Sequence, residues 1–358
     1  MKKEYGGFFC ESIESQNMVE DNENILYFDS ARSGIRFLLN KRKWTKKRVL
    51  LPDYLCESML IPFGDNNFEV HFYPIKRDFS INIDKMNELV KLVEPDLIYV
   101  ISFFGFHTLV SAETCLKKYQ EQNISILEDV THSYYGNFSS FIPDYKVGSL
   151  RKWCGLEEGG FLWSASVEEG KLFYEHRVHD INRKVLNLKI KCFQAKRDFL
   201  NNISDMKDFV NIYEKSELYL DEQVEVFTMS EENRRKLWYM NNKEIKEKRI
   251  KNYRLISENL KNVEGLLSTQ IDSYDMGVPL YFPMYVEHKK RNELRKKARE
   301  YNVFLPIIWP KSHKLDNYFV ENSIYEDILC IPCDQRWETK DILYMCDVIK
   351  KIMKEPKS

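Results

Sequence analysis

The chain has 358 residues, of which 43% are hydrophobic and 14% aromatic, and its 54 basic and 55 acidic side chains leave a formal net charge of -1. This length supports one large domain and a smaller one around a sizeable core. A charge so close to zero gives no field that draws nucleic acid or an anionic membrane. There is no apolar run of membrane-spanning or signal-peptide length, so we expect a cytoplasmic protein with neither partner.

The eight cysteines lie mostly inside apolar runs, without the dense spacing of a secreted disulfide scaffold, and this indicates reduced core residues. Cys330-Ile-Pro-Cys333 has the form of a redox pair. It falls in a strand-like run, however, and no second cysteine pair completes a zinc site. We therefore expect no metal.

Residues 1–24 are polar and acidic and are expected to form an N-terminal arm. Beyond them, short apolar runs alternate with stretches of helical periodicity. Strands are predicted at Ile25–Phe28, Val49–Leu51, Val70–Tyr73, Leu97–Ile101, Ile124–Leu127 and Gly160–Trp163. Helices are predicted from the turn at 29–34 and over Tyr54–Phe63, Ile83–Val93 and Ala112–Tyr119. This alternation predicts an α/β fold, with a mostly parallel sheet and helices on both faces.

The second half of the chain has a different rhythm. Residues 165–225 have helical spacing and are expected to be helices inserted in a large domain, 25–228. A helical stretch at Met229–Leu260 then links to a smaller C-terminal α+β domain, 229–358. In that domain we predict strands at Leu280–Phe282, Met284–Val286, Val303–Leu305 and Ile328–Cys333, and helices at Arg291–Tyr301 and Lys340–Lys351.

Three groups of candidate site residues fall at the carboxyl ends of predicted strands, where ligands collect in an open parallel sheet. The first is the turn Ser30-Ala31-Arg32, whose free N–H groups, hydroxyl and guanidinium suit a phosphate, although an ordinary helix cap explains it too. The second is Asp129. The third is Lys152, which lies just beyond the segment Asp144–Leu150 and precedes Gly159-Gly160. No Gly-x-Gly-x-x-Gly follows any strand, which disfavours an unrelated dinucleotide-binding or nucleotide-binding enzyme.

These groups suit pyridoxal phosphate. Its aldehyde needs a lysine amine of depressed pKa, its ring nitrogen needs an acid, and its phosphate needs a cradle of N–H and hydroxyl donors. Lys152, Asp129 and the Ser30 turn would fill these roles in that order. His132 would orient the acid or touch the ring, or is simply a structural histidine.

The order of several short motifs also resembles a known family. The motifs are Ser-small-Arg at the first helix, Leu51-Pro52-Asp53-Tyr54, Glu128-Asp129-x-x-His132-Ser133, Ser149-x-x-Lys152 with Gly159-Gly160, and Ile331-Pro-Cys-Asp-Gln335-Arg336. From about residue 25 to 355 the sequence is similar to the DegT/DnrJ/EryC1/StrS sugar aminotransferases. The resemblance implies a fold-type-I pyridoxal phosphate enzyme with a large domain built on a seven-stranded sheet.

The family implies a role for each matching residue. Lys152 would be the Schiff-base lysine and Asp129 the partner of the ring nitrogen, while His132 stands where members usually have Gln or His. Ala31 and Arg32 would lie near the phosphate, and Tyr54 near the ring-stacking aromatic. The family's phosphate-binding serine usually stands five residues before the lysine. Here Val147 takes that place, and Ser149, three residues before, is the candidate.

The resemblance also implies a reaction. An amino acid, commonly glutamate, would give its amino group to a keto-sugar, nucleotide-linked and used for surface polysaccharide or a secondary metabolite, within a homodimer. Relatives that perform dehydration have His in place of the lysine, and Lys152 argues against that branch. The Gly-x-Asn-x-Arg segment that members lend across the dimer has no clear counterpart before Met229-Ser230. A binding or regulatory protein on the same fold, or another reaction of the same cofactor, is therefore the alternative.

Overall fold

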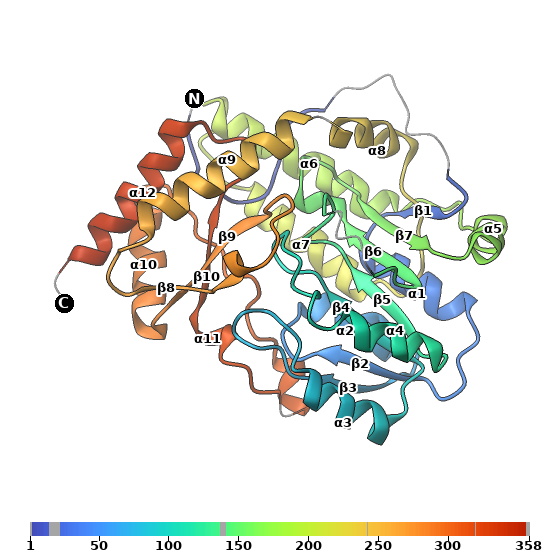
Figure 1. Ribbon diagram of the computed structural model, residues 1–358. Coiled ribbons are helices and arrows are strands. Elements are labelled where there is room, and N and C mark those ends of the chain that lie inside the picture. Colours follow the sequence, from blue (N-terminus) through green and yellow to red (C-terminus); the bar gives the residue numbers. More distant parts are fainter. Residues whose placement is uncertain (1, 14–21, 137–140, 242, 319, 356–358) are drawn as a thin grey trace.

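The chain folds around two β-sheets in the computed structural model, which describes residues 2–13, 22–136, 141–241, 243–318 and 320–355 (Figure 1). The strands of the larger sheet all precede residue 165, and those of the smaller sheet all follow residue 265.

The larger sheet has seven strands in the order β1-β7-β6-β5-β4-β2-β3. It is mostly parallel, as the alternation predicts, and only β7 runs antiparallel to its neighbours β6 and β1. The strands are β1 (Ile25–Phe28), β2 (Arg48–Pro52), β3 (Glu69–Tyr73), β4 (Leu97–Ile101), β5 (Ser125–Asp129), β6 (Tyr145–Ser149) and β7 (Gly160–Ser164). All five residues of β4 are buried, because helices cover both faces of a central parallel strand.

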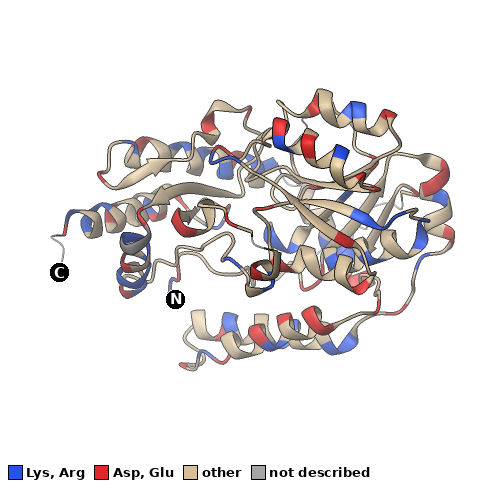
Figure 2. Cartoon of the chain, turned by 90° about the horizontal axis from the view of Figure 1, so that it is seen from below, with Lys and Arg blue, Asp and Glu red and all other residues tan. Residues whose placement is uncertain are grey.

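Helices on both sides of this sheet join its strands (Figures 1 and 2). They are α1 (Ala31–Lys41), α2 (Glu57–Asp65), α3 (Ile83–Val93), α4 (Glu113–Glu121) and α5 (Val167–Glu175). Helix α1 packs on β6 and β7, and it buries Ile35, Leu38 and Leu39 as their helical spacing predicts. Helix α2 begins later than predicted, because Tyr54 and Leu55 are drawn into the core before it.

The inserted helices predicted in 165–225 include a hairpin of α6 (Arg183–Leu200) and α7 (Phe209–Glu222), which pack side by side. Their shared core contains Cys192, Phe193 and Phe209. The predicted helical stretch Met229–Leu260 is wrong as one helix. It divides into α8 (Glu231–Lys236), a 3-10 turn at Leu237–Asn241 and α9 (Lys243–Leu260), because Leu237 and Met240 turn inward and are buried.

The smaller sheet is antiparallel, in the order β10-β9-β8. Its strands are β8 (Leu266–Ser268), β9 (Tyr281–Val286) and β10 (Ile328–Pro332), accompanied by α10 (His288–Glu300), α11 (Ile324–Asp327) and α12 (Thr339–Lys354). The two strands predicted around Pro283 are one strand. A proline is tolerated at position 283 because β8 pairs with β9 only at Met284, Tyr285 and Val286. No residue of β8 therefore lies opposite Pro283 and needs the N–H that proline lacks. The strand predicted at 303–305 is wrong, since Val303 makes only an isolated bridge with Tyr5.

Residues 2–13 lie along the body of the molecule. Tyr5 exchanges backbone hydrogen bonds with Asn302 and Phe304, at 2.9 and 2.8 Å. Phe8 stacks on Tyr213 of α7 with ring centroids 4.4 Å apart, and its carbonyl oxygen accepts a hydrogen bond from Arg336 at 3.3 Å. This N-terminal segment therefore ties the α6–α7 hairpin to the C-terminal part of the chain.

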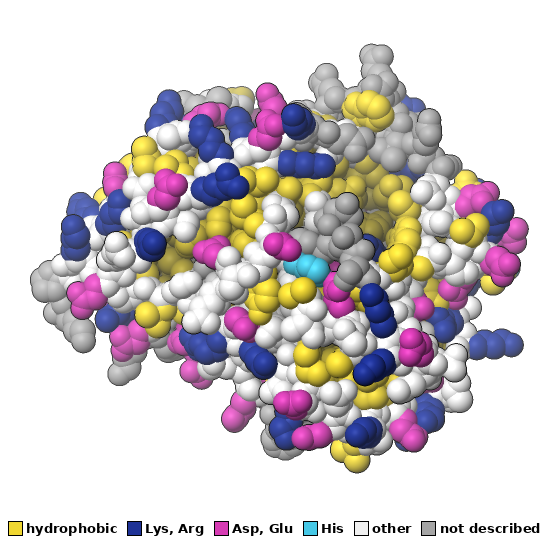
Figure 3. All heavy atoms as spheres, viewed as in Figure 1, with side chains coloured by type: hydrophobic (Ala, Val, Ile, Leu, Met, Phe, Trp, Pro, Cys, Tyr) yellow, Lys and Arg dark blue, Asp and Glu magenta, His cyan; other side chains and the backbone are white. Residues whose placement is uncertain are grey.

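Charges of both signs are interspersed along the helices (Figure 2). Figure 3 shows the same mixture over one face, around a hollow with hydrophobic side chains on its walls. Among the residues that the structure describes, no helix combines the length and the apolar character needed to cross a membrane.

Candidate active site

The three predicted groups meet at one end of the large sheet, where its parallel strands finish. Strands β5 and β6 are parallel neighbours with Asp129 opposite Val147, so Asp129 and the turn after β6 lie at the same end. Strand β1 reaches that end as well. Its last residue, Phe28, pairs with Gly160 of β7, and Gly160 in turn pairs with Ser149 of β6.

A cavity of about 310 Å³ lies at this end of the sheet, near the bottom of the usual size range for small-molecule sites. Seven of the eight predicted site residues line it, namely Ser30, Ala31, Arg32, Asp129, His132, Ser149 and Lys152. Residues from the C-terminal part of the chain close it, among them Tyr281 and Trp309. The structure thus brings together residues that lie more than 100 positions apart in the sequence.

Asp129 is held in a fixed orientation at the end of β5. One of its carboxylate oxygens accepts a hydrogen bond from the Tyr99 hydroxyl at 2.6 Å, and the other accepts one from the Thr131 backbone N–H at 2.7 Å. The residue is only 2% exposed. Burial raises the pKa of the carboxyl, and these two hydrogen bonds oppose the rise because they stabilise the ionised form.

Lys152 ends the 3-10 turn Leu150–Lys152 and extends into the open cavity, so water can reach it although protein atoms surround the site. This environment lowers the pKa of the Lys152 amine through desolvation, and the neighbouring Arg151 guanidinium lowers it further. A neutral amine is the reactive form of lysine toward a carbonyl carbon, so the shift favours nucleophilic chemistry.

The loop that follows Lys152 is locked to its surroundings. The Trp153 side chain is fully buried and donates a hydrogen bond to the Thr131 carbonyl oxygen at 2.9 Å. The Trp153 carbonyl oxygen accepts one from Gln335 at 2.7 Å and one from Arg249 at 3.3 Å. At Gly160 an added Cβ would come 2.0 Å from the Ser30 carbonyl oxygen, so only glycine lets β7 approach the turn before α1 so closely.

The turn before α1 presents backbone donors toward the cavity. Ser30 caps the helix, because its hydroxyl accepts a hydrogen bond from the Ser33 N–H, and it donates to Asp29 at 3.0 Å. The N–H groups of Ala31 and Arg32 belong to the first turn, which an α-helix leaves without internal acceptors. The Arg32 guanidinium forms ion pairs with Asp221 and Glu217 of α7.

Ser149 is at the end of β6, 8% exposed, and its backbone N–H donates to the Thr131 hydroxyl at 3.0 Å. Thr131 therefore links the β6 turn to the segment that bears Asp129 and His132.

His132 forms part of an aromatic wall. Its ring stacks on Trp309 with centroids 4.7 Å apart, and it packs against Phe104 at 4.9 Å. Burial and the nearby charge of Lys152 lower the pKa of His132 to about 3, so the imidazole is neutral at ordinary pH. Its Nδ1 atom is buried without a hydrogen-bond partner among the described residues.

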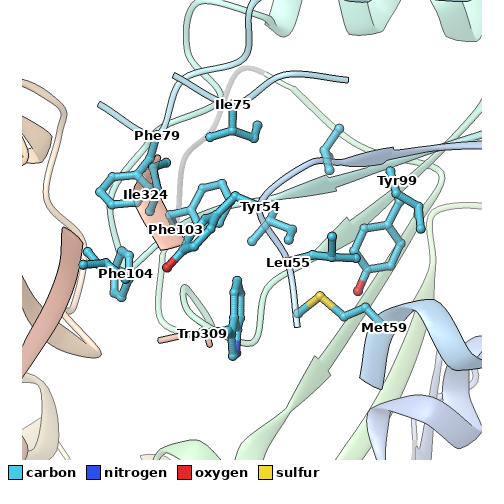
Figure 4. Close-up of a cluster of buried hydrophobic side chains, with 14 of the residues drawn as sticks. Tyr54, Leu55, Met59, Ile75, Phe79, Tyr99, Phe103, Phe104, Trp309 and Ile324 are labelled. Atoms are coloured by element: carbon cyan, nitrogen blue, oxygen red, sulfur yellow. The ribbon is translucent and has the colours of Figure 1, made fainter. Parts of the chain in front are cut away.

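Tyr54, which the resemblance places near a ring-stacking aromatic, does not line the cavity. It is fully buried in a cluster of aromatic side chains behind Trp309, with ring centroids 5.5 Å apart (Figure 4). The backbone beside it is tied to the core, since the Leu55 N–H donates to the Tyr325 hydroxyl at 2.9 Å, and the chain reaches the cavity only from Cys56 onward. Trp309, not Tyr54, is thus an aromatic side chain at the cavity surface.

Sequence reasoning missed several residues that the structure brings to the site. Trp309 follows a segment without clear periodicity, and only its aromatic character in Ile307-Ile-Trp-Pro310 could have drawn attention to it. Glu217 and Asp221 belong to a charged helix whose pattern is typical of a solvated face. Arg151 was visible as the neighbour of Lys152, but its ion pair with Glu217 at 2.7 Å was not.

The remaining motif of the sequence, Cys330-Ile-Pro-Cys333, lies in and after β10, where both cysteines are buried and free. Within the described ranges, no three His, Cys, Asp or Glu side chains are grouped so that they could hold a metal ion.

No protein-family model matches this sequence, and no curated protein is similar enough to be matched. Solved structures do match. PseC from Helicobacter pylori, an aminotransferase involved in the biosynthesis of pseudoaminic acid, is 13% identical with a TM-score of 0.70, and the match covers 98% of this chain and 99% of that chain.

Two further structures extend the likeness. A DegT DnrJ EryC1 StrS aminotransferase from Brucella abortus is 14% identical with a TM-score of 0.66, over 92% of this chain and 86% of that chain. Spr1654 from Streptococcus pneumoniae in its PLP-form is 12% identical with a TM-score of 0.69, over 98% of each chain. At these identities the likeness establishes the fold, and the fold that the resemblance implies is confirmed.

Proposed function

We propose that the chain is a pyridoxal phosphate-dependent aminotransferase that moves an amino group from an amino acid, glutamate first among the candidates, to a keto-sugar, nucleotide-linked and used in surface polysaccharide or secondary metabolite synthesis. The observation that carries the proposal is the meeting of Lys152 and a buried, oriented Asp129 in one cavity. These two residues meet on a fold that the chain shares with solved structures of sugar aminotransferases.

The residues present fit the cofactor. Asp129 is a buried carboxylate with both oxygens fixed, which suits a partner for a protonated ring nitrogen. The contact between Gly160 and Ser30 shapes a turn of backbone donors that suits a phosphate. His132 supports the fit as well, because its Nδ1 is an orphaned polar atom on a lining residue and a ligand could satisfy it.

The chain's own residues would divide the work. Pyridoxal phosphate, when bound, supplies an electron sink for charge that develops on the substrate carbon. Lys152 would hold the cofactor through its amine and afterwards move a proton at Nζ as general acid and base, and its lowered pKa favours the neutral amine that accepts the proton. Trp309 and His132 would exclude water from the ring face.

Absorbance and turnover test the proposal. The purified protein with added pyridoxal phosphate is expected to turn yellow, and Lys152→Ala is expected to remove the lysine-linked colour and slow transfer from glutamate by a factor of about 10²–10⁴. Asp129→Ala should also lose colour, whereas His132→Ala should keep it. Lys146→Ala is the matched control, because Lys146 lies on β6 with its amine over the Trp163 ring.

A wild-type protein that stays colourless and takes up no added cofactor would contradict the proposal. A protein that takes up the cofactor but turns over no keto-sugar in a panel would point to the binding or regulatory role. The resemblance further supports a homodimer, and sedimentation of the purified chain would test that part separately.

A further inference from the structure

Glu217 on α7 is the centre of a cluster of charged side chains beside the candidate lysine. Its carboxylate accepts a hydrogen bond from Arg151 at 2.7 Å, forms an ion pair with Lys189 of α6, and lies 3.5 Å from the Arg32 guanidinium. Three cations from three elements thus converge on one carboxylate that lines the same cavity as Lys152.

The geometry gives Glu217 a fixed charge. Burial opposes its ionisation, but Arg151 and Lys189 hold the pKa of the Glu217 carboxyl well below its usual range. Only 28% of the Glu217 side chain is exposed, and 12% of the Arg151 side chain, so water screens the pair weakly. A pair that is largely shielded in this way is costly to break, because a lone charge would be left behind.

The placement of Arg151 makes this pair matter for Lys152. The two residues are consecutive in the 3-10 turn, so two cations start from adjacent positions. Arg151 is directed toward α7, where Glu217 receives it. Among the described residues that line the cavity, the other charged or titratable groups are Arg32, Cys56, Glu57, Tyr99, Asp129, His132, Asp221 and Tyr281.

We infer that Glu217 is a positioning residue: it anchors Arg151 to α7 and so offsets the positive charge beside the Lys152 amine. This inference rests on the proposed function, which makes Lys152 the reactive amine. The inserted α6–α7 hairpin would then serve the site, because it carries the carboxylate that sets how readily the lysine gives up its proton.

The test measures the titration of Lys152 without any cofactor. The pH dependence of acetylation of Lys152 by acetic anhydride, followed by peptide mass spectrometry, reports the amine pKa. In Glu217→Gln the Arg151 charge is left unbalanced, so the midpoint is expected to fall by about one pH unit, the lower end of what a neighbouring charge produces. Glu217→Asp keeps the negative charge, so its midpoint should lie close to that of wild type.

Two further variants serve as a control and as an independent test of the ion pair. Glu214→Gln is the matched control, since Glu214 lies on the same helix at an exposed position, and it should leave the midpoint unchanged. Arg151→Gln approaches the pair from the other side and should raise the midpoint, and it decides the matter if Glu217→Gln fails to fold. An unchanged or raised midpoint in folded Glu217→Gln, or a lowered one in Arg151→Gln, would overturn the inference.

Cofactor uptake and acetylation midpoints, measured on the same protein, distinguish a failure of this inference from a failure of the proposed function. If wild-type protein takes up no pyridoxal phosphate, the proposed function fails, while the acetylation midpoints still report on Glu217. If the cofactor binds and the midpoints do not move, the inference fails alone.

Discussion

His132 is a buried imidazole that stays neutral because its surroundings cannot solvate a charge. It is 2% exposed, stacked on Trp309, and close to the positive charge of Lys152. A neutral ring there keeps one nitrogen as an acceptor and one as a donor, so it can serve a bound ligand in either sense. The same burial makes the protein sensitive to acid.

The acid sensitivity is a testable consequence. The pKa of His132 is about 3 in the folded chain, against about 6.5 for an unfolded histidine. Between these values the unfolded chain binds more protons, so the free energy of unfolding falls as the pH falls through this window. From pH 7 to pH 5 this one group removes about 2 kcal/mol.

The measurement compares denaturant unfolding of wild type and His132→Phe at pH 7 and pH 5. Phenylalanine keeps a ring against Trp309 but cannot titrate, so the variant should lose about 2 kcal/mol less than wild type over this range. Other groups that titrate in the window cancel in the comparison. His313→Gln, at a fully exposed imidazole, should behave like wild type. Equal losses in wild type and His132→Phe would contradict the account.

At the scale of single residues, only part of the site could be predicted from the sequence. Lys152 and Asp129 could be predicted because the cofactor's chemistry demands a lysine and an acid at strand ends. Trp309 could not, because it reaches the cavity through the packing of a segment more than 150 positions later. Glu217 could not either, since a carboxylate on a charged helix gives no sign that three cations will surround it.

Strand β7 and helix α1 meet at a contact that one missing side chain permits. A Cβ on Gly160 would lie 2.0 Å from the Ser30 carbonyl oxygen and 2.7 Å from the Ala31 nitrogen. Both neighbours are backbone atoms, so no flexible side chain can move aside. The start of α1 could then keep its place only if β7 were displaced.

Gly160→Ala is therefore expected to lower the free energy of unfolding by about 3 kcal/mol or more, and to abolish cofactor uptake if the proposed function holds. Gly64→Ala is the matched control, because Gly64 lies in α2 with no atom within 4 Å of the added Cβ. It should be stabilising by about 0.5–1 kcal/mol, since alanine loses less backbone freedom on folding. Denaturant unfolding of both variants checks the pair, and similar values for the two would refute the contact.

Whole elements were the more predictable level. The parallel strands stand out because buried runs such as Leu97–Ile101 are apolar throughout. The break between α8 and α9 could not be predicted, because the residues across it keep helical spacing while Leu237 and Met240 are pulled into the core. The missing strand at 303–305 has a similar cause: its partner is Tyr5, almost 300 positions earlier, and not a neighbouring strand.

Across the whole molecule, Arg249 joins parts of the chain that meet at the cavity. It lies on α9 with no exposed surface. Its guanidinium donates to the Trp153 carbonyl oxygen at 3.3 Å, to the Leu280 carbonyl oxygen at 3.1 Å and to the Gln335 side chain at 2.9 Å. The lysine loop, the start of β9 and the segment after β10 therefore share one buried cation.

Arg249→Met should lower the free energy of unfolding by at least about 3 kcal/mol, because it removes buried, charge-assisted hydrogen bonds to the Leu280 and Trp153 carbonyl oxygens and to the Gln335 side chain. Arg254→Met, at an exposed position on the same helix, should change it by no more than about 0.5 kcal/mol. Urea denaturation of the two variants is the measurement. If Arg249→Met were as stable as wild type, the shared cation would not be what holds these three segments together.

The division into domains at residue 228 stays a prediction, but the two sheets show why a boundary there is hard to derive from sequence. The cavity takes Asp129 and Lys152 from the first half and Tyr281 and Trp309 from the second. Local patterns report each half separately. The surface between the halves depends on contacts over long separations, which no local pattern encodes.

The N-terminal segment has a consequence for biosynthesis. The Tyr5 backbone forms hydrogen bonds with Asn302 and Phe304, and the Phe8 carbonyl oxygen accepts a hydrogen bond from the Arg336 guanidinium. During translation Tyr5 leaves the ribosome about three hundred positions before its backbone partners exist, whereas the Phe8 ring meets its stacking partner Tyr213 earlier. The backbone pairing of Tyr5 is then among the last contacts to form, and ribosomes stalled after residue 250 should leave Tyr5 more accessible to a protease than it is in the folded chain.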